Sequence, residues 1–569
     1  MKNYLLLLCL LPFQLFAQTV LIKDVNVLDV EKRAIIPNQS VLISNDKIER
    51  VAPFKKFKKV SPDSVIDGEG KYLMPGMMDT HIHFFQSGGL YTRPDALDLT
   101  SEVSYEAEIQ FGKDNAADYL RRYLRIGVTT VMDVGGPLWN FTVRDSIATS
   151  FNGPEVLVTG PLFSMVSRPQ MDKGDPPIIK TTSKAAMLEL FNRQLTKRPD
   201  FIKIWYIVNR ENPAEKTFPL VQYLGELCRQ HNLPLAVHAT QLKTAKLAVK
   251  AGANILVHSV DDALIPEDFV KTLKAQNVTL IPTMNVSGGY LKVFSGQIAH
   301  QEQDLLLANP FAYNSLLDPN KIDSARWPGV LKRLYGRDLS AYQVVEDSIM
   351  ESNLLKLSKA GVNIATGTDA GNIGTMHASS YLPELLGMKK AGLSNWDVIV
   401  SSTINAAKGF GLDTKTGSIK AGKTADLVLL EGNPVEDISQ VSSITAVIKS
   451  GEVMDVNDIL QETPTQVVQR QVNAYNARNI DAFLSTYSED VQIFNEKGEI
   501  TMEGHEAMRK VYAPMFDRVT DLYCNITNRI TINNKVIDKE KVRFNGRYVD
   551  AVALYTVENG KITAVHFVR

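Results

Sequence analysis

The sequence predicts an α/β protein built around a (β/α)8 barrel, with a small β-rich unit beside it and an α+β domain after it. Short apolar strands alternate with amphipathic helices between residues 75 and 410. Alternating β patterns with turn signals lie on both sides of that region. The last part of the chain, residues 463–569, has an apolar periodicity of its own. These three observations divide the chain into the units described below.

The N-terminal segment, residues 1–17, is typical of a secretory signal peptide. Lys2 gives it a positive start, an almost wholly apolar run follows, and Ala17 offers a small residue for cleavage. We therefore expect export to the periplasm or the extracellular space. Because no other apolar segment is long enough to cross a bilayer, we expect no membrane insertion once the signal is removed. Cys9 leaves with the signal, so only Cys228 and Cys524 remain and no disulfide framework is predicted.

The overall charge narrows the choice of partners. The chain has 569 residues, with 62 basic and 63 acidic side chains and a formal net charge of −1. Nucleic acid or an anionic membrane surface usually needs a basic patch, which this balance does not favour. We therefore expect a small-molecule substrate and no nucleic acid.

Two β-rich pieces, residues 18–74 and 411–456, flank the central region. Stretches such as "VLIKDVNVLDV" and "TADLVLLEGNP" have the short strands and Asx and Gly turns of antiparallel sheets. Because the two pieces have the same pattern of short strands and turns, we predict that they complete one small β-sandwich.

The central region contains eight candidate strands, from "YLMPGMMDTHIH" to "VNIATGTDAG". Right-handed βα units of this number close into a barrel. A doubly wound open sheet is the alternative, but it would want a glycine-rich phosphate loop after an early strand, and the sequence has none. Between the seventh and eighth strands, residues 287–342 interrupt the alternation and are predicted to be a long irregular loop over the barrel mouth.

Polar residues interrupt the apolar strands near their C-terminal ends, where barrel enzymes place catalytic groups. His81 and His83 are two apart on the first strand and so point to the same side. Four other strands end in the same way, at Lys203, His238, His258 and Asp369. Imidazoles and carboxylates together are the ligands of zinc and similar divalent metals.

Lys203 is the unusual member of this set, because an ammonium beside metal ions would be repelled. Burial lowers the pKa of a lysine, and a neutral amine can react with carbon dioxide to form a carbamate that bridges two cations. The alternative is an ion pair between Lys203 and Asp369 in a site without metal.

The motifs "PGMMDTHIH", "GTDAG" and "STINAAKGFGL", with the strand-four lysine and the two strand-end histidines, resemble the amidohydrolase superfamily. More narrowly, residues 20–456 look like its branch of imidazolonepropionase-like and prolidase-like (Xaa-Pro dipeptidase) enzymes. The sequence departs from the prolidase-like pattern just after Lys203, at Trp205 and Tyr206, which leaves the substrate class open.

The resemblance implies two divalent metal ions, with zinc as the expected metal. One metal would take His81, His83, carboxylated Lys203 and Asp369, and the other would take carboxylated Lys203, His238 and His258. It also implies that a hydroxide bridging the metals attacks the substrate carbonyl and that Asp369 shuttles the proton. Four further residues are candidates for substrate contact: Tyr206, Arg210, Arg168 and His377.

Residues 463–569 resemble the ketosteroid-isomerase-like (SnoaL-like) cone fold. The resemblance rests on an amphipathic first helix, "YSEDVQIF", "GHEAMRKVYAPMF" and the terminal "GKITAVHFVR". Asp490 and His505 are polar candidates for its cavity, although surface placement is favoured for both. We expect an accessory role or the formation of a homo-oligomer through this domain.

The predicted activity is hydrolysis of an amide bond, in a dipeptide or an N-acyl amino acid. One alternative is a deaminase or a cyclic-amide or lactone hydrolase on the same barrel. Another is a non-catalytic binding protein that acts through the C-terminal domain.

Overall fold

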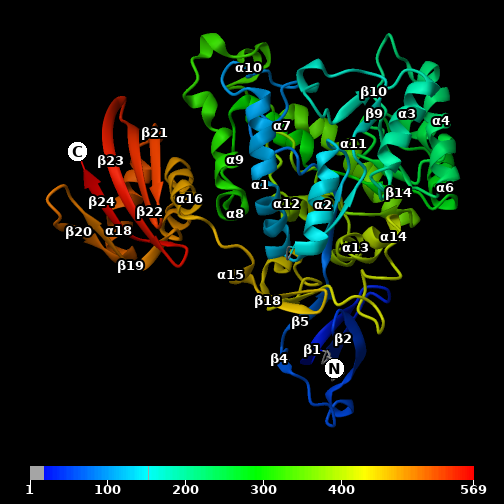
Figure 1. Cartoon of the computed structure of the whole chain (residues 1–569), viewed down its shortest axis with the longest axis horizontal. Coiled ribbons are helices and arrows are strands. Elements are labelled where there is room, and N and C mark those ends of the chain that lie inside the picture. The colour runs from blue at the N-terminus through cyan, green and yellow to red at the C-terminus, as the bar shows by residue number, and fades with distance from the viewer. Residues whose placement is uncertain (1–17, 151–152, 569) are drawn as a thin grey trace, which may run out of the picture.

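The computed structural model describes residues 18–150 and 153–568, so the predicted signal peptide lies outside the described part of the chain. A helical and stranded central body carries the N-terminal sheet at one end and the C-terminal domain at its side (Figure 1). Among the described residues, no helix is both long and apolar enough to cross a membrane.

One sheet joins both flanks of the central region, in the order β18-β17-β16-β5-β1-β2-β3, with β4 beside β1. Its strands are β1 (Thr19–Asp29), β2 (Ala34–Ser44), β3 (Lys47–Pro53), β4 (Ser64–Asp67), β5 (Tyr72–Pro75), β16 (Leu427–Leu430), β17 (Ile444–Lys449) and β18 (Glu452–Asp455). Antiparallel pairing of β5 with β16 connects the two flanks. Alternate side chains of both, such as Ile22 and Leu427, share one buried apolar cluster, which is why strands so far apart in sequence assemble together.

The predicted strand–helix alternation of the central region is confirmed. Eight strands follow one another in the chain: β6 (Met77–Ile82), β7 (Val128–Asp133), β8 (Glu155–Val158), β11 (Ile202–Trp205), β12 (Leu235–His238), β13 (Ile255–Val257), β14 (Thr279–Ile281) and β15 (Asn363–Ile364). The strands form two sheets, β6-β7-β8 and β10-β9-β11-β12-β13-β14-β15, and in the second the short strands β9 (Leu162–Ser164) and β10 (Ile178–Lys180) lie beside β11. The segment after β15 returns to β6, where the amide of Thr80 donates to the carbonyl of Thr366 at 2.9 Å and that of His83 to Ala370 at 2.8 Å.

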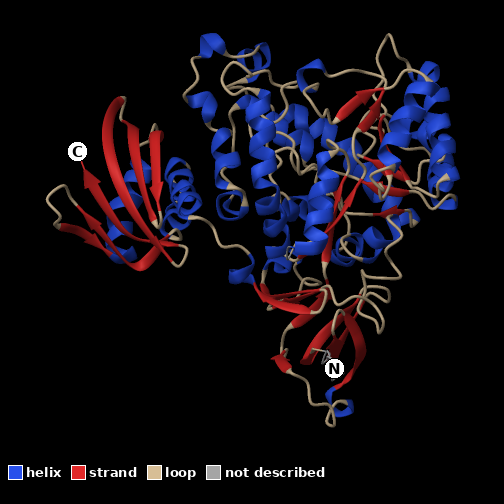
Figure 2. Cartoon of the chain, viewed as in Figure 1, coloured by secondary structure: helices blue, strands red, loops and turns tan. Residues whose placement is uncertain are grey.

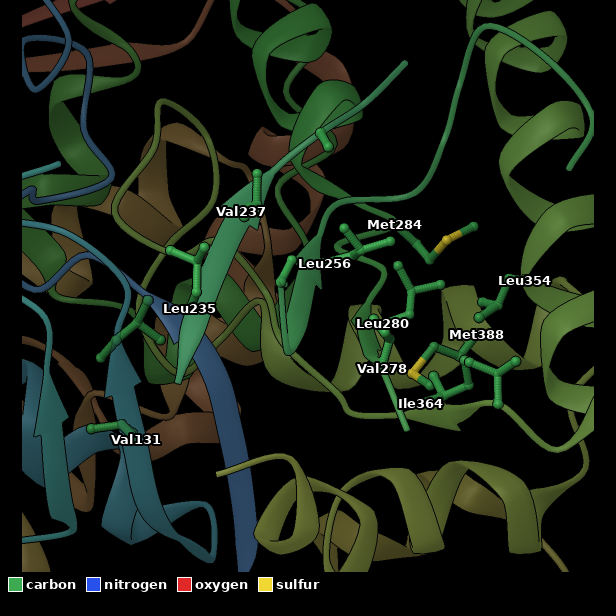
Figure 3. Packing of buried hydrophobic residues seen from close by; sticks show 14 of the residues in the cluster. Val131, Leu235, Val237, Leu256, Val278, Leu280, Met284, Leu354, Ile364 and Met388 are labelled. Carbon is green, nitrogen blue, oxygen red and sulfur yellow. The ribbon is translucent and has the colours of Figure 1, made fainter. Parts of the chain in front are cut away.

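Helices surround these strands (Figure 2). They are α1 (Tyr105–Arg125), α2 (Trp139–Ser150), α3 (Lys184–Leu195), α4 (Ala214–Gln230), α5 (Leu242–Ala251), α6 (Glu267–Ala275), α11 (Ser340–Ala360), α12 (Tyr381–Lys390), α13 (Asn395–Ser401) and α14 (Ile404–Gly409). Strand side chains such as Leu256 and Leu280 pack towards helix side chains such as Leu354 and Met388 (Figure 3). This apolar layer holds the strand ends, and with them the polar groups, in fixed positions.

The prediction of an irregular loop over residues 287–342 is wrong. The segment forms short helices: α7 (Val286–Ser295), α8 (Glu302–Leu307), α9 (Pro310–Ser315) and α10 (Gly329–Leu334), with 3-10 turns η3 (Asp318–Asn320) and η4 (Ser324–Arg326). Helices of six residues are too short to produce a recognisable apolar period. Local signals stabilise them instead, as where the Asn309 side chain caps α9 and Pro310 occupies its first turn.

The C-terminal domain has a six-stranded sheet in the order β20-β19-β24-β23-β22-β21. Its elements are α16 (Pro464–Asn476), α17 (Ile480–Leu484), β19 (Tyr487–Phe494), β20 (Ile500–Glu503), α18 (Gly504–Arg518), β21 (Tyr523–Ile532), β22 (Lys535–Phe544), β23 (Arg547–Glu558) and β24 (Lys561–Val568). A short helix, α15 (Val456–Ile459), precedes them. The predicted α+β character is thus present, with helices and sheet packed as two layers.

A buried charge cluster joins this domain to the central body. The Glu462 carboxylate accepts hydrogen bonds from Arg122 of α1, at 2.8 Å, and from Arg470 of α16. Arg470 also donates to the carbonyl of Ala308, at 3.1 Å. The two guanidinium groups lower the pKa of Glu462 to about 2, against the opposing effect of burial.

We predict that Glu462→Ala lowers the free energy of unfolding by about 3–5 kcal/mol at neutral pH, because it leaves buried guanidinium groups without their partner. Since the pKa of Glu462 is depressed in the folded chain, its contribution is complete above the ordinary value of 4.5 and is lost as the pH falls towards about 2. In urea unfolding, the difference in the free energy of unfolding between the variant and the parent protein should be smaller at pH 3 than at pH 7. The matched control is Glu431→Ala, whose exposed pair with Lys71 contributes little; equal losses in both variants would contradict the prediction.

Candidate metal centre

All six predicted ligands line one cavity of about 280 Å³ at the C-terminal ends of the barrel strands. His81 lies in β6 and His83 just after it, Lys203 lies in β11, and His238 ends β12. His258 follows β13 and Asp369 follows β15. The structure therefore brings together residues that are spread over almost three hundred positions of the chain.

Three of these side chains meet at a single carboxylate oxygen. Asp369 Oδ1 lies 3.2 Å from His81 Nε2 and 3.1 Å from His83 Nε2, and the two Nε2 atoms are 3.2 Å apart. On its far side, the His83 ring bonds through Nδ1 to the carbonyl of Gly135 at 2.7 Å, which fixes its orientation. Lone-pair donors that converge in this way suit a cation.

His238 and His258 form the other half of the site. Their ring centroids are 4.5 Å apart, and His258 Nδ1 lies 3.9 Å from Asp369 Oδ2. His258 Nδ1 also lies 2.7 Å from the hydroxyl of Thr283. Ligand atoms of His81, His258 and Asp369 all lie within 4.8 Å of one another, a spacing that one metal ion can bridge.

Lys203 lines the same cavity as both halves and is only 2% exposed. Within the described residues its ammonium has no hydrogen bond and no carboxylate within 4.0 Å, so the alternative of an ion pair with Asp369 is not formed. Burial lowers the pKa of Lys203 to about 7. A substantial share of neutral amine at neutral pH is the condition that carbamate formation needs.

Burial sets the charges of the other ligands. It lowers the pKa of His81 to about 4 and that of His238 to about 3, so both imidazoles are neutral and can donate lone pairs. Burial opposes ionisation of Asp369, yet the adjacent imidazoles hold its pKa well below the ordinary value. A carboxylate, neutral imidazoles and a neutral amine form a donor set that fits divalent metal ions.

The backbone is strained where it presents two of the ligands. His258 has φ of 75° and Asp369 has φ of 60°, in the left-handed region that costs a non-glycine residue roughly 1 kcal/mol or more. Nearby, a Cβ at Gly367 would lie 2.8 Å from the Cβ of His81, so only glycine allows this close approach. Strain of this kind persists where surrounding packing fixes it, as it does at many functional sites.

Sequence reasoning missed a network that holds Asp369 in place. Asn372 donates to Asp369 Oδ1 at 2.7 Å and accepts from Arg93 at 2.6 Å and from Tyr290 at 2.8 Å. Arg93 is in turn held by both oxygens of Asp95. These residues lie in irregular segments and in α7, where no strand period shows which way a side chain points.

The four candidates for substrate contact lie outside the cavity lining. Tyr206 is buried and donates to the carbonyl of Ala214, and Arg210 is exposed. Arg168 covers the ring of Trp205 from outside. His377 is buried against the ring of Tyr119, with Nε2 at 2.7 Å from the carbonyl of Gln86.

Comparison with known families gives two matches. The model of the amidohydrolase family matches residues 72–454, and that of the SnoaL-like domain matches residues 468–565. Guanine deaminase of Escherichia coli (strain K12) is 23% identical over 74% of this chain and 87% of its own length. Imidazolonepropionase of Shouchella clausii (strain KSM-K16) is 23% identical over 76% of this chain and 89% of its own.

Solved structures show the same fold. A Xaa-Pro dipeptidase with bound methionine in the active site superposes with a TM-score of 0.59 at 21% identity, over 77% of this chain and 100% of that one. Ochratoxinase of A. niger gives 0.58 at 19% identity, over 77% and 97%. At these identities the similarity supports a TIM-barrel-like α/β fold, and it does not transfer a substrate.

We predict that Asn372→Ala weakens metal binding about 10- to 100-fold, because Asp369 loses the hydrogen bond that orients it. Competition with a chelator of known affinity measures the change. Asn209→Ala, which alters an exposed loop outside the cavity, serves as the control. Unchanged affinity in Asn372→Ala would show that the carboxylate is held without this network.

Proposed function

The chain belongs to the amidohydrolase family, and we propose that this metal-dependent hydrolase of carbon–nitrogen bonds works with a binuclear centre. One metal, with zinc as the expected ion, would be held by His81, His83, Asp369 and carboxylated Lys203. The other would share the carbamate and take His238 and His258. The observation that carries the proposal is Lys203, which lies buried in the same cavity as the other ligands and has no ion-pair partner within the described residues.

We propose an amide as the bond cleaved, in a dipeptide or an N-acyl amino acid. When bound, the metals supply a polarised carbonyl and a water with a lowered pKa. Water oxygen adds to the carbonyl carbon, the carbon–nitrogen bond breaks, and one proton must reach the leaving nitrogen. Asp369, ionised and oriented by Asn372, is placed to take that proton from water and deliver it.

The cavity walls support a small organic substrate. Besides the ligands, Trp205, Tyr290 and Leu162 contribute apolar and aromatic surface, and Arg93 contributes a buried cation. A volume of about 280 Å³ lies just below the range of roughly 300–1,000 Å³ for small-molecule pockets, so the substrate should be small. Because the predicted signal peptide precedes the described residues, we place this activity outside the cytoplasm.

Deamination of a purine-like compound is the second candidate, favoured by the similarity to guanine deaminase. Lys203 argues against it, because one-metal members of the family generally work without this lysine. A substrate panel of dipeptides, N-acyl amino acids, lactones and purines distinguishes the two activities by their products. Amide hydrolysis releases an amine and a new carboxylate, whereas deamination releases free ammonia.

We predict two metal equivalents per chain in the parent protein and a clear loss in Lys203→Ala, because the bridging ligand is removed. Elemental analysis after reconstitution with zinc, manganese or cobalt in bicarbonate measures this. Carbon-13-labelled bicarbonate should add a carbamate resonance that the variant lacks, while exposed Lys180→Ala keeps both signals. A parent protein that binds no metal under these conditions would overturn the binuclear proposal.

We predict that Asp369→Asn keeps much of the metal but loses turnover by about 10²–10⁴-fold, because the amide cannot accept the proton. Turnover on the best substrate of the panel and metal content are measured on the same preparation. Asp261→Asn, a cavity carboxylate outside the ligand set, is the matched control. An active Asp369→Asn enzyme would remove Asp369 from the proton transfer.

A further inference from the structure

The central body contains a second cavity, which lies between α12 and the short helices that follow β14. It measures about 370 Å³, and α7, α8, α12 and residues 374–376 contribute to its wall. Protein interiors contain few voids larger than a water molecule, and pockets for small molecules span roughly 300–1,000 Å³. This cavity is therefore large enough to hold a small organic molecule.

We propose that this cavity is a ligand site separate from the metal centre, where Asp304 binds the charged group of a small organic ammonium ion and apolar side chains hold the rest of the ligand.

Asp304 lines the cavity with a carboxylate that is only partly satisfied. Its Oδ1 accepts a hydrogen bond from the Ser379 hydroxyl at 2.6 Å, whereas Oδ2 has no hydrogen bond and no ion pair within the described residues. Burial raises the pKa of this carboxyl group, against the opposing effects of Ser379 and Lys292. An ammonium group beside Oδ2 would stabilise the ionised carboxylate, which the apolar surrounding otherwise disfavours.

Thr375 supplies a second polar group that lacks a partner. It is 2% exposed and lines the cavity, and its hydroxyl has no hydrogen-bond partner among the described residues. A Cβ at Gly289 would lie 2.8 Å from Thr375 Oγ1, so a glycine in α7 leaves the space around this hydroxyl open. Buried polar groups are normally hydrogen-bonded, and a ligand with N–H donors would satisfy this one.

Much of the remaining wall is apolar, with contributions from Val293, Ile298, Leu316, Met376 and Leu386. A bare inorganic cation would need several further oxygen ligands, which these side chains cannot provide. The wall therefore suits an ammonium group that is attached to an apolar body.

The charged side chains of the lining also favour a cation in its interior. Asp304 is the only acidic residue that lines the cavity within the described part of the chain. Lys292 and Lys390 line it too, but both are exposed, and Lys390 pairs with Glu351 at 2.7 Å. Exposed charges are well screened by water, whereas a ligand carboxylate deep in the cavity would lie beside Asp304.

Helix α7 contributes to the walls of both cavities, since Tyr290 lines the metal site and Val293 lines the second cavity. The amide of Thr375 donates to the carbonyl of Asn372 at 2.8 Å, and Asn372 orients Asp369. A bound ammonium ion would therefore contact the helix and the loop that position Asp369. None of the six candidate metal ligands lines the second cavity, so the two sites can be tested separately in the full chain.

The test compares phenethylamine with 2-phenylethanol, which carries a hydroxyl in place of the ammonium group. Calorimetric titration of the metal-loaded full chain should show one phenethylamine site, with an affinity about 10- to 100-fold higher than that for 2-phenylethanol, because hydrogen bonds to charged groups are stronger. Asp304→Asn, which can still accept from Ser379, should remove this difference. Asp261→Asn, which changes a carboxylate of the metal cavity, should keep it.

A second pair of variants tests the location of the ligand. Ile298→Trp, which places a larger side chain in the wall, should weaken phenethylamine binding at least about tenfold. Gln297→Trp, exposed next to it and outside the lining, should leave the affinity unchanged. Treatment with a chelator should also leave it unchanged, because the metal ligands do not line this cavity.

Absence of phenethylamine binding, equal affinities for the two probes, or a preference that persists in Asp304→Asn would overturn the proposal. Undiminished binding in Ile298→Trp, or loss of binding on chelation, would do so even if Asp304→Asn did not fold. These measurements record neither metal content nor turnover, so this proposal and the proposed function fail separately.

Discussion

The metal centre depends on the hydrogen bonds that close the barrel between β6 and the segment after β15. The amide of Asp369 donates to the carbonyl of His81 at 2.7 Å, which places the Asp369 carboxylate directly beside the two imidazoles of β6. Asp79 secures the same seam from below, since its carboxylate accepts from both the amide and the hydroxyl of Thr368. Without this closure, ligands from the two ends of the barrel would not converge.

Closing the barrel also buries several ionisable groups, and their burial sets the protonation states of the site. Several ionisable groups are removed from water together, and burial favours the uncharged form of each. The imidazoles become neutral and Lys203 becomes a partly neutral amine, while Asp369 stays ionised among them. These are the protonation states in which nitrogen and oxygen ligands bind a divalent cation, so the fold prepares the donor set before any metal arrives.

The sequence predicts those residues of the site that lie on strands, because side chains alternate between the two faces of a strand. A polar residue that interrupts an apolar strand near its end has a defined direction, so the sequence can place all six candidate ligands at one cavity, as the geometry of the strands requires and the structure shows. Asn372 and Tyr290 come from a loop and a short helix, where direction depends on tertiary contacts. The sequence also fails to predict the short helices within residues 287–342, because helices of six residues are too short to show an apolar period. Strand period also predicts direction in β22, where Asp538 and Glu540 alternate with Lys539 and Lys541. There the two acids are buried inside the domain and the two lysines are exposed.

The insertion between β14 and β15 connects the metal site to the C-terminal domain. Its first helix, α7, contributes Tyr290 to the wall of the metal site, while α8 and α9 pack on α16. Helix α16 contacts both parts of the chain: Asn473 donates to the carbonyl of Pro310 in the insertion, and Gln471 lines a cavity inside the C-terminal domain. The C-terminal domain thus contacts the barrel through this helix and this insertion, and also through the pair of Glu462 with Arg122 of α1. Arg470 and Glu462 hold α16 against the central body by buried ionic contacts.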